Sequence, residues 1–333
     1  MRAFYCDPCV LRALALTLLG TAAPAPPPPP PPTPPIPLTR LVCLVEQARR
    51  LPLADLGVPA GSRPLDLALG KGTVWVLFAP SLLVGVPRAA PAGEPAAHAE
   101  YGAIEEVDMI PGPRPDAWQS LAADPWDGTL WLASPAGLWR RRPGRRPEPV
   151  RVGKPAAGGF RQAVPARGAV WAAPACDADA VWRLDNQGKV LGTGLPDAAA
   201  PGGCAAAELA RDWSGDLLAL RPATGEVLRL AFDGTWQPHP GIAAPAPPPA
   251  GRPPIRRWFF WGTEPVALAD TPEGEGSVIY RRDAGAAGAV AAFREDCGPG
   301  DALVAVAGDS RGWAALTRRF LLVGEHRRDG VSH

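Results

Sequence analysis

DPWDGTLWLASPAGLWRRR, residues 124–142, contains two short apolar runs joined by a tight turn. The turn Pro-Trp-Asp-Gly leads into the first run, 129–133, and the turn at 134–137 reverses the chain into 138–142. Short apolar runs bounded by turn residues are typical of a β-hairpin. The stretch therefore predicts one hairpin of a larger antiparallel sheet.

The same pattern recurs along the chain at intervals of 40 to 56 residues. This interval is long enough for four short strands, which is typical of one propeller blade. A sustained 3.6-residue apolar pattern, which a helical solenoid needs, is missing from the sequence. We therefore predict an all-β, six-bladed β-propeller, with the copies registered at Gly72–Trp75, Gly128–Trp131, Gly168–Trp171, Gly215–Leu218, Glu264–Ala267 and Ser310–Trp313.

Aromatic and basic residues take regular places in these copies. Trp75, Trp131, Trp171 and Trp313 stand at corresponding positions and are expected to fill the core between blades, because large rings supply the burial that short sheets need. The basic run 139–142 follows on a third strand, and we expect its arginines to face water.

The end of the chain predicts how the ring closes. The last strand, 320–324, leaves the sixth blade one strand short. Residues 49–56, RRLPLADL, precede the first inner strand and are predicted to supply the missing strand, which would remove both free sheet edges. Residues 38–47 are interpreted as an extra strand or a short helix.

The N-terminal region differs in composition from the rest. Residues 1–23 have the basic start, apolar segment and small residues of a secretory signal, and eleven of the fourteen residues 24–37 are proline, which predicts an extended spacer. The expected organisation is a signal-like segment (1–23), a proline-rich linker (24–37) and a propeller (38–333). The protein is then secreted, periplasmic or bound to the cell envelope, with membrane contact only through an uncleaved 1–23, or cytoplasmic if 1–23 is not a signal.

The charge balance argues against some partners. Lys and Arg total 34 against 33 Asp and Glu, so the net charge of +1 gives no basis for nucleic-acid binding. The four histidines are scattered and do not form a cluster with metal-ligand spacing.

Cysteine usage depends on export. If the two N-terminal cysteines leave with a signal, four remain, and four cysteines allow three disulfide pairings. Cys176 is predicted between the second and third strands of blade three, and Cys204 in the connection into blade four. These two loop types share one face of a propeller, so we predict a Cys176–Cys204 disulfide, which leaves Cys43 with Cys297. Four free thiols are the alternative.

Two longer segments resemble known repeats. WDGTLWLASPAGLWRRRPG resembles the repeats of bacterial two-component-regulator propellers. GAVWAAPACDADAVWRLDNQGKVLG is similar to the six-bladed propellers of the NHL, regucalcin and streptogramin-lyase families. The resemblance covers residues 50–325 loosely and implies blade construction without specifying a reaction.

Regucalcin-like lactonases imply a candidate metal site. They hold a divalent ion at the axis with Glu, Asn and Asp, whereas Asn186, the one asparagine here, lies in a predicted hairpin turn. The same acids could instead accept backbone amides beside turns. No cofactor is predicted, except Ca²⁺ if the protein is such a hydrolase. The weak metal-ligand candidates are Asp66, Asp124, Asp212, Asp270 and Asp309.

One catalytic motif also occurs. Residues 308–312, Gly-Asp-Ser-Arg-Gly, match the G-x-S-x-G nucleophile elbow, which needs a helix after it and an acid and a histidine later in the chain. The following residues fit a blade strand better, so we interpret the motif as a blade turn.

We therefore expect a non-catalytic binding or scaffold propeller that holds a protein or small-molecule ligand at one face. The alternative is a metal-dependent, regucalcin-like hydrolase (lactonase) or a lyase. An enzyme should bring three or more polar or acidic side chains together at one mouth of the channel.

Overall fold

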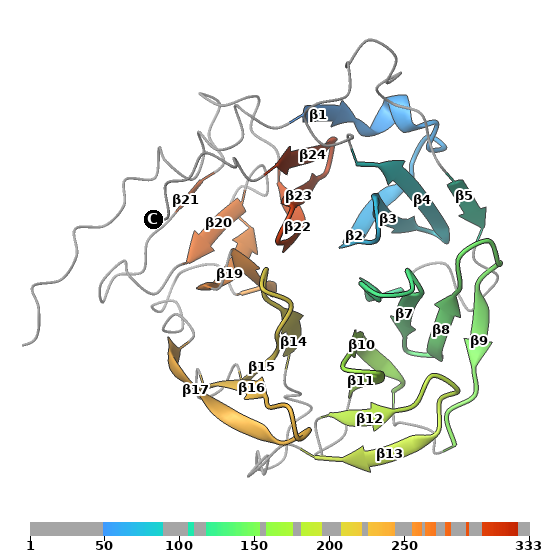
Figure 1. The fold of residues 1–333 in the computed structure, drawn as a ribbon. Helices are drawn as coiled ribbons and strands as arrows, with labels where there is room; N and C mark the ends of the chain where they lie inside the picture. Colours follow the sequence, from blue (N-terminus) through green and yellow to red (C-terminus); the bar gives the residue numbers. More distant parts are fainter. Residues whose placement is uncertain are drawn as a thin grey trace, which may run out of the picture. The chain divides into compact units, whose positions relative to one another are not determined.

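Six four-stranded antiparallel sheets make up the fold in the computed structural model. The structure describes residues 49–88, 106–109, 118–153, 158–175, 181–194, 208–221, 226–243, 255–261, 264–270, 277–280, 291–292 and 302–325. Figure 1 shows the sheets around a common axis, with one strand of each sheet nearest the centre. The predicted all-β, six-bladed propeller is confirmed.

Each blade runs from an inner strand beside the axis to an outer strand at the rim. Blades 1 to 3 consist of β2 (Arg63–Leu69), β3 (Thr73–Ala79), β4 (Leu82–Pro87), β5 (Glu106–Met109); β6 (Ser120–Ala123), β7 (Leu130–Ser134), β8 (Gly137–Arg141), β9 (Glu148–Val150); and β10 (Phe160–Ala166), β11 (Ala169–Pro174), β12 (Trp182–Leu184), β13 (Val190–Thr193). Blades 4 to 6 consist of β14 (Glu208–Arg211), β15 (Leu217–Arg221), β16 (Glu226–Leu230), β17 (Trp236–Ala243); β18 (Arg257–Trp261), β19 (Glu264–Asp270), β20 (Ser277–Tyr280), β21 (Ala291–Ala292); and β22 (Leu303–Asp309), β23 (Gly312–Thr317), β24 (Phe320–Glu325) with β1 (Arg49–Pro52).

The N-terminal strand closes the ring. β1 pairs antiparallel with β24, from Arg49 opposite Val323 to Pro52 opposite Phe320, and is the outer strand of blade 6. The predicted closing strand is therefore confirmed for its first half. Its second half, Leu53–Leu56, forms a 3₁₀ turn that buries both of its leucines in the core between blades 6 and 1. Two residues three apart lie on one side of a 3₁₀ turn, which explains why this segment turns inward.

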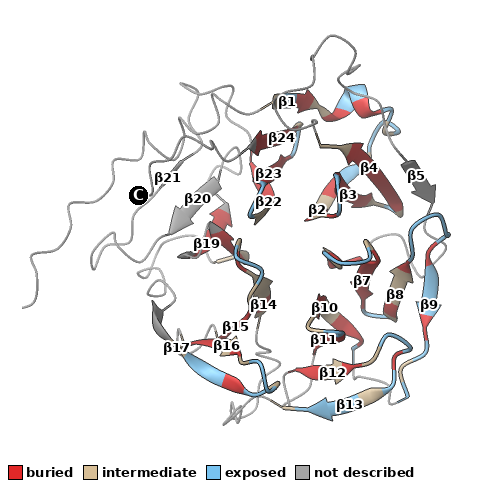
Figure 2. Cartoon of the chain, in the orientation of Figure 1, coloured by how far each residue is buried: buried red, intermediate tan, exposed pale blue. Residues whose placement is uncertain are grey.

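Apolar residues of neighbouring blades interlock to form the core. Trp75, Trp131 and Trp171 are buried and pack against the next blade in chain order, as predicted. A Cβ on Gly85, opposite Trp75 in the next strand, would stand 2.8 Å from the ring, so only glycine leaves room for that indole. Figure 2 shows the buried strands within the blades and exposed outer strands such as β13.

Trp313 does not correspond to the other three tryptophans. Trp75 pairs with Ala68 of its inner strand, and the matching residue of blade 6 is Ala314, which pairs with Ala307. Side chains alternate between the faces of a sheet, so the one-residue offset sends Trp313 to the opposite face. There it packs against blade 5, and the predicted equivalence is wrong for this residue.

Two of the three arginines in 139–142 depart from the prediction, whereas Arg142 is exposed as predicted. Arg140 has only 13% of its side chain exposed, forms an ion pair with Glu148 at 2.7 Å and donates a hydrogen bond to the backbone oxygen of Asn186 in blade 3. Arg141 is 1% exposed and lies over the ring of Trp75 at 4.5 Å. A third strand within a ring has neighbouring blades on both faces, so Arg140 and Arg141 contact blades 3 and 1 instead of facing water.

Several predictions fall outside the described residues. These are the signal-like segment 1–23, the linker 24–37, the segment 38–47 and the four cysteines Cys43, Cys176, Cys204 and Cys297. In the described part of the chain, no helix has the length and apolarity that a bilayer crossing requires.

Removing β1 tests the closure. A chain that starts at residue 57 should lose the sharp thermal unfolding transition, because β24 becomes a free sheet edge and the core between blades 6 and 1 loses its N-terminal leucines. Circular dichroism during heating measures the transition, and a chain that starts at residue 49 is the control. An equal melting temperature for both chains would contradict the closure.

Candidate functional site

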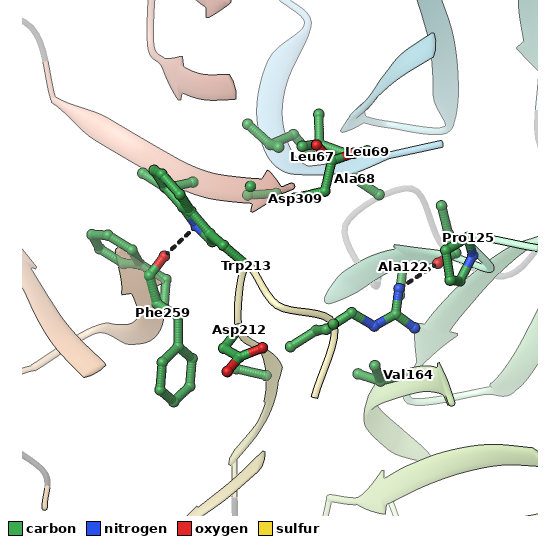
Figure 3. Close-up of a pocket in the computed structure, with 18 of the residues that line it drawn as sticks. Leu67, Ala68, Leu69, Ala122, Pro125, Val164, Asp212, Trp213, Phe259 and Asp309 are labelled. Atoms are coloured by element: carbon green, nitrogen blue, oxygen red, sulfur yellow. Dashed lines mark hydrogen bonds between the residues drawn. The ribbon is translucent and has the colours of Figure 1, made fainter. Parts of the chain in front are cut away.

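The six inner strands enclose a channel that contains two cavities. A cavity of about 680 Å³ lies toward the turns that follow the inner strands, and we call this side the turn end. A cavity of about 540 Å³ lies at the side where the inner strands begin. Gln162 and Arg257 line both cavities, so the two meet at these residues. Figure 3 shows the turn end, with residues of several inner strands around the space.

One corresponding position recurs in all six inner strands, and five of its six residues line one or both cavities. We call the set the axial ring, and the ladder identifies it, because each member pairs with the matching residue of its second strand. Five of the six members are polar. The axial ring consists of Asp66, Ser120, Gln162, Glu208, Arg257 and Ala305.

Acceptors of the axial ring bind amides of the following blade. Asp66 Oδ2 accepts a hydrogen bond from the Leu121 amide at 2.7 Å, and Gln162 Oε1 accepts one from the Leu209 amide at 2.7 Å. Glu208 accepts one from the Trp258 amide at 3.1 Å. An inner strand has no neighbouring strand on its channel side. Its backbone amides on that side therefore need hydrogen-bond acceptors from side chains. The axial ring therefore fastens blade 1 to 2, 3 to 4 and 4 to 5.

An ion pair links blades 5 and 1 across blade 6. Arg257 lies 2.8 Å from Asp66 Oδ1, and Asp66, which is 1% exposed, also accepts the amide of Leu67 at 2.7 Å. Blade 6 lies between these two blades in the ring, and its axial-ring residue is Ala305.

The other predicted metal ligands lie apart from Asp66. Asp124 accepts the Trp126 amide at 2.8 Å, and Asp212 accepts the Asp216 amide at 2.8 Å and the Ser214 hydroxyl at 2.7 Å, so both stabilise turns. Asp270 ends β19, and its side chain is outside the described set. Within the described residues, no three His, Cys, Asp or Glu side chains group closely enough to hold a metal ion.

Asp309 joins blade 6 to blade 1. Its carboxylate accepts hydrogen bonds from both terminal nitrogens of Arg88, at 2.6 and 3.1 Å, and from the Arg311 amide at 2.8 Å. Partial burial raises the pKa of Asp309, but the hydrogen bonds from Arg88 and from the backbone outweigh this effect and hold the pKa below its usual 3.8. Because Asp309 pairs with Gly312 across the hairpin, residues 308–312 form a blade turn, which confirms that interpretation of the G-x-S-x-G match.

The second cavity is strongly basic, and we call it the arginine mouth. The described residues that line it include five arginines and a single acid, Glu208. The others are uncharged. Burial raises the pKa of Glu208, although Arg161 and Arg257 oppose this. The five are Arg63, Arg161, Arg256, Arg257 and Arg318.

Sequence reasoning missed the arginine mouth because its arginines are far apart in the chain. Arg63 and Arg257 are the first residues of β2 and β18, and Arg161 is the second residue of β10. A search for charge at the starts of inner strands could have found them.

Comparisons with known proteins address the fold. No family model and no curated protein matches this chain. Among solved structures, it is similar to PorZ of Porphyromonas gingivalis (11% identity, TM-score 0.42, 80% of this chain and 32% of PorZ). It is also similar to virginiamycin B lyase of Staphylococcus aureus (10%, 0.43, 84% and 99%) and to a putative gluconolactonase (15%, 0.46, 86% and 94%).

These likenesses agree with the predicted resemblance to the lyase and regucalcin group, at the level of the fold alone. The chain spans about a third of the length of PorZ.

A double-mutant cycle tests the link between blades 5 and 1. Asp66→Ala should lower the free energy of unfolding by about 3 kcal/mol, because it leaves the Leu121 amide and the Arg257 charge without their acceptor. Arg257→Met should cost less, and the double variant should be more stable than the sum of both losses predicts. Urea unfolding measures each step. Strict additivity would show that the two side chains are not coupled.

The lowered pKa of Asp309 predicts a pH effect. The folded pKa lies below the unfolded value, so the Arg88–Asp309 contribution is fully present above pH 3.8 and is lost as the pH falls through the folded pKa. The stability difference between the natural protein and Asp309→Asn should therefore shrink on acidification. Urea midpoints measured between about pH 6 and 3 check this, and Asp127→Asn, at an exposed turn, is the control. A difference that stays constant with pH would contradict it.

Proposed function

We propose that this chain is a non-catalytic binding propeller that holds a protein or small-molecule ligand at the arginine mouth. One observation carries the proposal. The described acids of the channel are bound to amides or arginines of the fold, whereas the arginine mouth is a cavity of about 540 Å³ whose outer arginines, Arg63, Arg256 and Arg318, are exposed. The channel thus uses its acids for structure and keeps basic groups at one face for contact.

Converging polar side chains are present at this mouth, as an enzyme would require, but their chemistry favours binding. Guanidinium groups do not coordinate divalent cations, which take oxygen ligands, and they cannot act as general bases at neutral pH. Glu208 already accepts the Trp258 amide and lies among the arginines. This supports the binding proposal over the metal-dependent lactonase or the lyase.

The proposed location is the cell envelope or the extracellular space. It rests on the signal-like composition of residues 1–23 and the proline-rich spacer after them.

Calcium addition separates the proposal from the hydrolase alternative. The melting temperature should be the same in excess CaCl₂ and in EDTA, because Asp66, Asp124, Asp212 and Asp309 are bound within the fold. Differential scanning fluorimetry measures the melting temperature, and hydrolysis of gluconolactone is followed in parallel. A calcium-dependent rise that Asp66→Asn abolishes, together with lactone hydrolysis, would replace the binding proposal with the enzyme.

A further inference from the structure

We infer that the arginine mouth binds a compact polyanion, a ligand that carries several carboxylate or phosphate groups. The inference rests on the proposed binding function and names the chemistry of its ligand. It is argued from the charge, the geometry and the support of the arginines.

The charge of this cavity differs from that of the chain. Among the described residues, five arginines outweigh Glu208 and the Asp66 carboxylate that binds Arg257 by three positive charges, while the whole chain carries +1. Counted in the same way, the described lining of the turn end has Lys71, Arg211 and Arg311 with Asp212 and Asp309, and Arg88 pairs with Asp309, so the excess there is two positive charges. A cleft lined by one sign of charge concentrates ligands of the opposite sign. Among the described residues, the excess of positive charge is therefore larger at the arginine mouth.

The arginines approach the cavity from around the ring. Arg63 belongs to blade 1 and Arg161 to blade 3. Arg256 and Arg257 lie at the start of blade 5, and Arg318 lies in the turn between β23 and β24 of blade 6. Arginines placed around one axis suit a compact ligand seated at the centre. The volume of about 540 Å³ lies in the range of small-molecule sites, about 300–1,000 Å³.

Bulges in the inner strands shape the same mouth. The ladders of β2, β10 and β22 each skip one residue, and the skipped residues are Leu65, Arg161 and Val304. All three line the arginine mouth. A bulge bends its strand and redirects a side chain, so the three-fold recurrence of this irregularity at one end of the channel forms the cavity wall and places Arg161 in it.

The protein holds several of these arginines in place before a ligand arrives. Arg257 is fixed by Asp66 at 2.8 Å, and the Arg256 side chain donates to the backbone oxygen of Leu303. The backbone amides of Arg256 and Arg318 bind Leu268 O and Ala302 O at 2.7 and 3.0 Å. Preorganised groups lose less entropy on binding, and the planar guanidinium matches a carboxylate or phosphate with two parallel hydrogen bonds.

Isothermal titration calorimetry at about 0.15 M NaCl, where exposed charges are screened, tests the inference on the full chain. The probes are citrate, which carries carboxylates, and pyrophosphate, which carries phosphates. The variant Arg63→Ser/Arg318→Ser should bind whichever probe binds the natural protein at least about tenfold more weakly. The matched control is Lys71→Ser/Arg311→Ser, which removes two exposed charges from the turn end and should bind within about twofold of the natural protein.

A second variant gives a change of opposite sign. Glu208→Gln keeps an oxygen that can accept the Trp258 amide and removes the one described acid of the mouth. It should bind the same probe several-fold more tightly, because a nearby negative charge opposes an anionic ligand. A gain in affinity cannot result from misfolding.

Three results would overturn the inference. They are no binding of citrate or pyrophosphate, an equal loss of affinity in the turn-end control, or tighter binding by Arg63→Ser/Arg318→Ser. A heptaglutamate peptide is included as a further arm. If only this peptide binds, and Arg63→Ser/Arg318→Ser does not bind it, the inferred ligand class of compact polyanions is wrong, while the proposed binding function stands. The proposed binding function is contradicted by a different result, namely calcium-dependent stabilisation together with lactone hydrolysis.

Discussion

Each inner strand of this propeller has a hydrogen-bonded neighbour on one side only, and the rest of the structure depends on how the other side is satisfied. Buried backbone amides need acceptors. Asp66, Gln162 and Glu208 provide them across blade boundaries, to Leu121, Leu209 and Trp258. The channel is therefore lined by polar side chains for a structural reason, and acids at the axis are not by themselves a sign of metal binding.

The same constraint acts at the point of closure. β1 pairs with β24 and completes blade 6. The ion pair between Arg88 and Asp309, the last residue of the inner strand β22, joins blade 1 to blade 6. Arg257 of blade 5 pairs with Asp66 of blade 1. Blades 5, 6 and 1 are thus held by a strand pair and two ion pairs, which links residues from opposite ends of the described chain.

Use of the acids within the fold concentrates the remaining charge at one end. The arginine mouth keeps an excess of positive charge because its one described acid, Glu208, lies among five arginines. Among the described residues, the turn end has a smaller excess of positive charge and is lined by indoles such as Trp213, which donates to the backbone oxygen of Phe260 at 3.0 Å (Figure 3). A propeller whose two ends differ in this way has one end suited to an anionic ligand.

The sequence by itself determined the all-β class, six blades and closure by residues 49–52, because turn residues and apolar periodicity are local signals repeated in each blade. It also indicated the buried Trp75, Trp131 and Trp171. Only the tertiary structure decided the register of Trp313, the burial of Arg141, the pairing of Asp66 with Arg257 and the gathering of Arg63, Arg161, Arg256 and Arg318 at one mouth. These features join residues from different blades, far apart in the chain, and a one-residue change of register, which local patterns do not fix, reverses the face on which a side chain lies.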